Sequence, residues 1–143
     1  MMDPLRIFLG FDFGMMYIGV ATGQTLTSSA TPLKTIKAKD GIPDWSEIDD
    51  LITTWKSTDL IIGLPLNMDD SVQVMTHRAI KFANRLHERF RLPIHLVDER
   101  LSTWEANSYL GKNNNLKKDF NKLNAIAAAL LIKQYLQQTS SAL

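Results

Sequence analysis

Two acidic positions in this chain lie where catalytic metal ligands often lie, at the ends of apolar runs. The first is Asp12, which follows the run Ile7–Phe11, typical of a buried strand. A buried carboxylate without a cationic partner costs several kcal/mol. The sequence offers no lysine or arginine between Asp12 and Lys34. A divalent cation is therefore an attractive partner for Asp12.

The second acidic position is the pair Asp98 and Glu99, which follows the apolar run Ile94–Val97. Neighbours on a strand point to opposite faces, so we expect only one of the two to serve a site. If the two strand ends lie close together, their carboxylates converge. Grouped oxygen ligands suit Mg²⁺ or Mn²⁺, and two such ions can stabilise a phosphodiester displacement. Pairing with Arg100, or capping of the next helix, is the structural alternative.

The elements that must position these acids alternate along the chain. Hydrophobic periodicity predicts strands at 6–13, 17–24, 29–37, 59–64 and 94–100, and helices at 45–56, 72–91, about 104–111 and 122–138. Pro32 favours an edge or irregular position for the third strand. This order predicts a single α/β domain over residues 1–143. Its mixed five-stranded sheet would have antiparallel strands first, parallel strands later, and helices on its faces.

Composition excludes several classes of protein. The 143 residues are 45% hydrophobic and 22% charged, which argues against disorder, and no apolar run is long enough to span a bilayer. The absence of cysteine excludes disulfides and thiolate chemistry. The N-terminal residues lack the layout of a signal peptide. We expect a soluble cytoplasmic protein.

Basic residues gather in the second half of the chain, although the net charge is only +1. One row of four repeats at helical spacing beside an apolar stripe: Arg78, Lys81, Arg85 and Arg89. Such a row could lie along a phosphate backbone. Long basic side chains also flank buried stripes simply to cover them, and both interpretations stay open.

The aromatic and imidazole side chains give weaker signals. The three histidines, His77, His87 and His95, show no ligand spacing. Ser102 and Thr103 are better explained as helix caps than as nucleophiles. The tryptophans fit core or partly buried positions better than base-stacking platforms: Trp45, Trp55 and Trp104.

Taken together, the motifs resemble the YqgF (RuvX-like) family over nearly the whole chain. The matching segments are Phe11-Asp12-Phe13-Gly14 with Ile18-Gly19-Val20, Gly63-Leu64-Pro65-Leu66-Asn67-Met68-Asp69, and Asp98-Glu99-Arg100-Leu101-Ser102-Thr103. The resemblance implies an RNase H-like fold and a metal-dependent nuclease. Members have been regarded as Holliday-junction resolvases, and also as the nuclease that processes the 5′ end of precursor 16S ribosomal RNA.

The resemblance also implies a metal-dependent catalytic site that contains Asp12 and Glu99. A third acid of the family opens the last helix, and here the matching segment Lys122–Ala125 places Asn124 at that position. The asparagine carbonyl can ligate a hard cation but removes one negative charge. Metals would be held less tightly, and catalysis could be weak or lost. Asp119 is an alternative source of the missing charge.

The expected substrate is structured nucleic acid, either pre-rRNA or branched DNA, and a junction-resolving role would favour a homodimer. Asn67 and Arg100 follow strand ends, where they could touch substrate and a scissile phosphate. The remaining expected nucleic-acid contacts are basic: Arg78, Lys81, Arg85, Lys117, Lys118 and Lys122.

Two other classes of function remain open. An actin-like or sugar-kinase-like ATP-binding protein also places an aspartate, a glycine and a hairpin at a strand end, but 143 residues leave no second lobe to close over a nucleotide. A catalytically silent nucleic-acid-binding or ribosome-assembly factor is motivated by Asn124. Salt-dependent RNA binding without cleavage would favour it.

Overall fold

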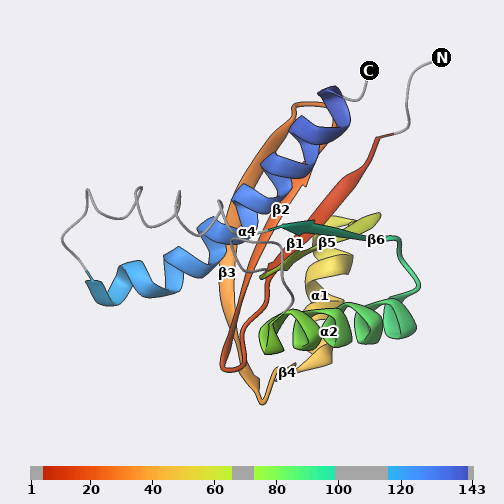
Figure 1. Cartoon of the computed structure of the whole chain (residues 1–143). Coiled ribbons are helices and arrows are strands. Elements are labelled where there is room, and N and C mark those ends of the chain that lie inside the picture. The colour runs from red at the N-terminus through yellow and green to blue at the C-terminus, as the bar shows by residue number, and fades with distance from the viewer. Residues whose placement is uncertain (1–4, 66–72, 99–115, 142–143) are drawn as a thin grey trace.

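A mixed six-stranded sheet forms the centre of the molecule in the computed structural model, which describes residues 5–65, 73–98 and 116–141. The strand order is β4-β3-β2-β1-β5-β6 (Figure 1). The antiparallel part contains β1 (Ile7–Asp12), β2 (Tyr17–Gln24) and β3 (Ser29–Lys39). The strands β5 (Asp59–Leu64) and β6 (Ile94–Asp98) run parallel to β1. The predicted mixed sheet is thus confirmed.

The sheet has one strand more than the five that the sequence predicts. The additional strand β4 (Ile42–Pro43) pairs with Lys39 and Ala38 of β3. Gly41 makes this return possible because its φ of 78° is in the left-handed region. Two residues are too few to show periodicity, so the pattern could not reveal the strand.

The third strand is irregular at Pro32, as predicted. Val20 pairs with Lys34 and Ala21 pairs with Pro32, so the register shifts between them. Proline has no N–H to donate to a ladder, and a bulge accommodates that loss.

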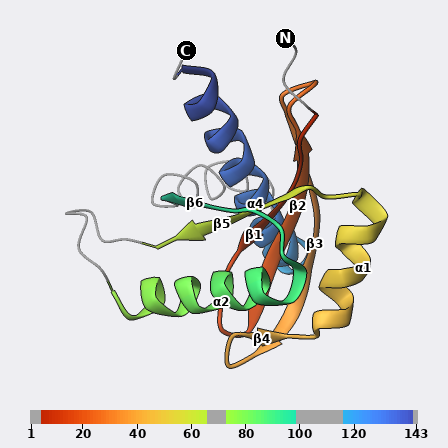
Figure 2. The ribbon, with the colours of Figure 1, turned by 90° about the vertical axis from the view of Figure 1, so that its right-hand side faces the viewer.

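Three described helices cover the two faces of the sheet (Figure 2). On one face lie α1 (Trp45–Trp55) and α2 (Val74–Phe90), and on the other lies α4 (Leu116–Ser141). Asp44 caps α1, with its carboxylate accepting from the Ser46 N–H at 3.0 Å. The helix predicted near 104–111 lies outside the described residues. None of the helices within the described ranges is long and apolar enough to cross a membrane.

The last helix is longer than predicted. It begins at Leu116 and not at Lys122, so the mostly polar stretch 116–121 is helical as well. This stretch contains neither glycine nor proline, and its lysines are good helix formers. Polarity alone was therefore a poor indicator of a loop.

Each face of the sheet carries its own core. Under α1 and α2, Phe82 packs against Phe11 and Phe13, with ring centroids 5.6 and 5.0 Å away. Under α4, Leu131 and Ile132 are fully buried in a second cluster with Phe8, Ile61 and Val97. The last helix therefore supplies much of the core on this face of the sheet.

Candidate metal site at the carboxyl end of the sheet

Asp12 lies at the end of β1 on the face of the sheet that α4 covers. Leu9 and Phe11 belong to the core under α1 and α2, whereas Phe8 packs in the α4 cluster. Because a strand presents alternate residues to opposite faces, Asp12 shares its face with Phe8. The residue is half-buried. The acid therefore stands at the carboxyl end of the sheet, the edge where α/β proteins build their sites.

The packing of α4 brings Asn124 to the same place. Asp12 is the register partner of Gly19 in β2, and directly opposed residues project to the same face. A Cβ at Gly19 would lie 1.9 Å from the carbonyl oxygen of Asn124, so the helix backbone rests directly on Gly19. Asp12 and Asn124 thus flank one glycine, although 112 positions separate them in the sequence.

The side-chain amide of Asn124 is a buried polar group without a partner. Its Nδ2 atom has no hydrogen-bond acceptor within the part of the chain that the structure describes. An unsatisfied buried donor costs about 1–3 kcal/mol, and such atoms are uncommon enough to require an explanation. Because Nδ2 is a donor, the missing partner is an acceptor atom, which a bound ligand would supply.

The strand β6 separates the two acids of the second motif. Val97 packs in the α4 cluster, so Asp98 projects to the opposite face, the one under α2. Asp98 therefore does not share a face with Asp12. Glu99 is the next residue in the sequence and lies outside the described residues. Within residues 5–65, 73–98 and 116–141, no group of three histidine, aspartate or glutamate side chains is placed to hold a metal.

The basic row on α2 lies on the other face of the sheet from Asp12. The Nη1 atom of its first member, Arg78, is 3.6 Å from Met15 Sδ, in the turn that follows Asp12. Lys81 is exposed and Arg85 is half-buried. Arg89 has a different role, since its guanidinium stacks 4.4 Å from the centre of the Trp45 ring. The row thus runs away from the carboxyl end of the sheet.

Of the other expected nucleic-acid contacts, Lys122 is exposed on α4, close in sequence to Asn124. Lys117 and Lys118 belong to the first turn of α4, and the structure describes only their backbone. Asn67 and Arg100 lie outside the described residues, as does Trp104. Asp119, the alternative acid, is helical and not in a loop.

Sequence reasoning missed a polar network at the opposite end of the sheet. Asp59, only 2% exposed, begins β5 and receives a hydrogen bond from Arg6 at 3.2 Å. His95 Nε2 lies 2.7 Å from the second carboxylate oxygen of Asp59. The hydroxyl of Tyr135 on α4 lies 3.2 Å from His95 Nδ1. The network ties α4 to β5 and β6.

The environment of Asp59 keeps it ionised. Burial raises the pKa of its carboxyl, but hydrogen bonds from His95, Thr58 and Arg6 outweigh that effect and hold the pKa below the usual value. One signal in the sequence could have revealed this: an acid that opens the apolar run Leu60–Leu64 needs a partner as much as Asp12 does. The histidine spacing, by contrast, gives no sign of the role of His95 in this network.

Comparison with known proteins gives matches over nearly the whole chain. The model of a family described as "RuvX: Holliday junction resolvase" matches residues 6–138. A Legionella pneumophila protein named "Putative pre-16S rRNA nuclease" is 52% identical over 139 residues, covering 95% of this chain and 99% of its own. A Pseudomonas putida protein of the same name is 46% identical over 138 residues, covering 95% and 98%.

Solved structures give a more distant likeness. The fowlpox virus resolvase in complex with Holliday junction DNA aligns with a TM-score of 0.55 at 11% identity, over 94% of this chain and 99% of that one. RuvC of T. thermophilus in complex with a Holliday junction substrate aligns with a TM-score of 0.54, also at 11% identity, over 94% and 96%. At this identity the likeness shows the fold alone, which is RNase H-like as expected.

Proposed function

The chain belongs to the RuvX family, and from that membership we propose that it is a metal-dependent nuclease that hydrolyses phosphodiester bonds in structured nucleic acid. The observation that supports the proposal is the packing of the Asn124 backbone on Gly19, the register partner of Asp12, at the carboxyl end of the sheet. This packing brings an amide residue from α4 near an acid from β1.

The residues present fit a hard divalent cation. A carboxylate and an amide carbonyl are oxygen donors of the kind that Mg²⁺ and Mn²⁺ take. We assign Asp12, Asn124 and, from the motif, Glu99 as the residues that would hold it. When bound, such a cation lowers the pKa of water and stabilises charge on a phosphate.

The protein's own residues then position the substrate. Lys122, exposed on α4 close in sequence to Asn124, is available to a phosphate beside the metal site. Arg78 on α2 contacts Met15, in the turn that follows Asp12. Lys81 and Arg85 extend the positive charge along α2, and we assign them to backbone contacts away from the scissile bond. From the motifs and the sequence we assign further contacts to Asn67, Arg100, Lys117 and Lys118.

The 5′ end of precursor 16S rRNA is the substrate that we favour. The relatives named for that activity share about half of this chain's residues over almost their full length. Four-way DNA junctions are the second candidate, which the name of the family favours. A four-way junction presents two equivalent strands, so that activity would require a homodimer. We place the rRNA-processing activity in the cytoplasm.

A cleavage assay tests the proposal. Wild-type protein with Mg²⁺ or Mn²⁺ is given two substrates, an RNA that spans the 5′ end of precursor 16S rRNA and a four-way DNA junction. Asp12→Asn should abolish cleavage of whichever substrate is cut. Asp98→Asn is the matched control, because it changes an acid on the opposite face of the sheet and should keep cutting. Equal cleavage by wild type and Asp12→Asn would overturn the assignment.

This chain has Asn124 where the resemblance implies a third acid. The competing function is therefore a catalytically silent factor that binds nucleic acid. Its signature is RNA binding by the wild type without cleavage at any metal concentration. If Asn124→Asp then cleaves the same RNA, the wild-type site is intact except for one missing negative charge. If the wild type cleaves, the silent alternative is excluded.

A further inference from the structure

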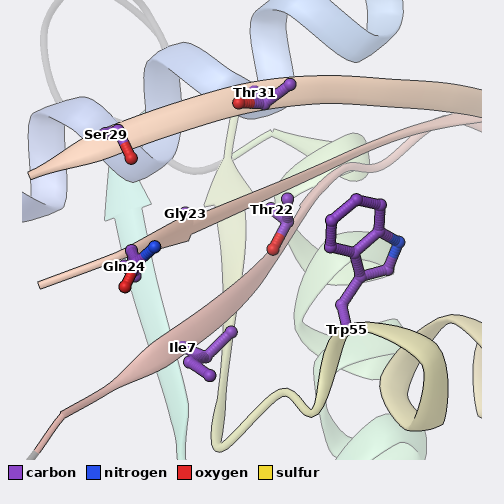
Figure 3. A pocket seen from close by; sticks show the side chains of 7 residues that line it. All are labelled: Ile7, Thr22, Gly23, Gln24, Ser29, Thr31 and Trp55. Carbon is purple, nitrogen blue, oxygen red and sulfur yellow. The ribbon is translucent and has the colours of Figure 1, made fainter. Parts of the chain in front are cut away.

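A small cavity lies on the face of the sheet opposite Asp12, beyond the end of α1. Its volume is about 220 Å³, and it is bordered by strand residues and by the last residue of α1 (Figure 3). The lining residues are Ile7, Thr22, Gly23, Gln24, Ser29, Thr31 and Trp55. The sequence predicted a core or partly buried position for Trp55, but its side chain is 41% exposed. The exposed indole is available to a molecule that enters the cavity.

The lining offers hydrogen bonds and no charge. None of the residues that line the cavity is ionisable. The hydroxyl of Thr22 already donates to the Phe8 carbonyl, and that of Ser29 pairs with Thr27. The amide of Gln24 and the hydroxyl of Thr31 have no side-chain hydrogen bond to any residue that the structure describes. A neutral ligand with donors and acceptors on its edge would satisfy both groups.

The size of the cavity limits the ligand to one small ring system. Pockets for drug-sized molecules measure about 300–1,000 Å³, and this cavity is smaller. A phosphate would find no cation within the lining. A planar base can stack on the indole and meet the Gln24 amide, which offers one donor and one acceptor edge. Stacking of this kind tolerates any base because every base has a π-face.

We propose that this cavity captures one unpaired nucleobase, which stacks on Trp55 and hydrogen-bonds to Gln24 and Thr31. The choice of a nucleic-acid strand as its source rests on the proposed nuclease function. Ile7 lies five residues before Asp12 on β1, roughly 17 Å at the rise of a strand. The captured base would therefore belong to a part of the substrate several nucleotides from the scissile bond.

Binding is measured by NMR on the ¹⁵N-labelled full chain, so that no cleavage is needed. Adenosine, cytidine and glucose are titrated separately, and the Trp55 indole and Gln24 amide signals are followed. Saturable shifts with the nucleosides and none with glucose are expected. Shifts with glucose alone would overturn the proposal in favour of a sugar site. No saturable shift with any of the three would also overturn it.

Variants and strands identify the source of the base. Trp55→Leu should weaken binding of a single-stranded oligonucleotide about five- to 100-fold, Trp55→Phe should retain most of it, and Thr54→Ala, exposed on the same helix, is the control. Gln24→Leu should weaken binding without removing the stack. A blunt duplex of equal length should leave the Trp55 signal unmoved.

The two proposals can fail separately. If nucleosides bind but Asp12→Asn cleaves normally, only the nuclease assignment fails. If Asp12 is essential but nucleosides do not bind, only the nucleobase inference fails.

Discussion

The carbonyl oxygen of Asn124 occupies the space where a side chain on Gly19 would begin. A Cβ there would come within 1.9 Å of that oxygen, a distance that no real contact permits. Only glycine allows α4 to approach β2 this closely. Because Gly19 is paired with Asp12, this contact sets where α4 meets the end of β1.

We therefore expect Gly19→Ala to displace α4. The free energy of unfolding should fall by about 1–3 kcal/mol, measured by urea denaturation, because the added methyl group overpacks the interface. Cleavage should fall further than the loss of folded protein explains. Gly23→Ala is the matched control: its Cβ would meet Ser29 O at 2.5 Å and Ile132 Cγ2 at 2.6 Å, near the other end of β2. Equal loss of cleavage in both variants would contradict a local role for the Gly19 contact.

Asn124→Asp should bind Mn²⁺ more tightly than the wild type. The substitution adds a negative charge beside Asp12 without changing the size of the side chain. Isothermal titration should show an affinity at least about tenfold higher, equivalent to 1.4 kcal/mol. Asp12→Asn should change the affinity in the opposite direction. An unchanged affinity in Asn124→Asp would remove Asn124 from the metal site.

The stability of the protein should fall at acid pH partly through Asp59. The pKa of Asp59 is lower in the folded protein than its ordinary value, so its stabilising contribution is complete above about pH 4 and is lost as the pH falls through the folded pKa. Asp59→Asn should be less stable than the wild type at pH 7, and the difference should narrow below about pH 4. Urea denaturation at a series of pH values measures this. Thr58→Val, which removes one of the three donors, should show a smaller version of the same change. A difference that is constant down to pH 3 would contradict this account.

Two members of the basic row should respond differently to substitution. Lys81→Gln should weaken nucleic-acid binding and reduce the slope of log K against log salt by about 0.7–0.9, since one phosphate contact is lost. Arg89→Gln should instead lower stability by about 0.5–1 kcal/mol, because its guanidinium stacks on Trp45. Filter binding at several salt concentrations and urea denaturation separate the two effects. An unchanged salt slope in Lys81→Gln would favour the other interpretation, in which the basic side chains of α2 only cover the buried stripe.

Periodicity in the sequence was sufficient to predict most elements of the fold. The strands β2 and β5 have the predicted bounds, 17–24 and 59–64. The stripe of α2 is also as predicted, with Ala79, Phe82 and Leu86 buried. These elements follow from local patterns because burial of one face imposes a period of 2 or 3.6. The two-residue β4 and the early start of α4 have no such period.

Local patterns in the sequence identify the candidate site residues: Asp12 at the end of one apolar strand, Asp98 and Glu99 at the end of another, and Asn124 near the start of an apolar helix. The fold decides which of these residues come together. Strand alternation separates Asp98 from Asp12, and the absence of a Cβ at Gly19 lets Asn124 reach the same face as Asp12. It also decided that Trp55 stands exposed beside a cavity and that Asp59 and His95 form one network. Such relationships join residues distant in the chain, and their physical cause, close packing between elements, leaves no trace in local periodicity.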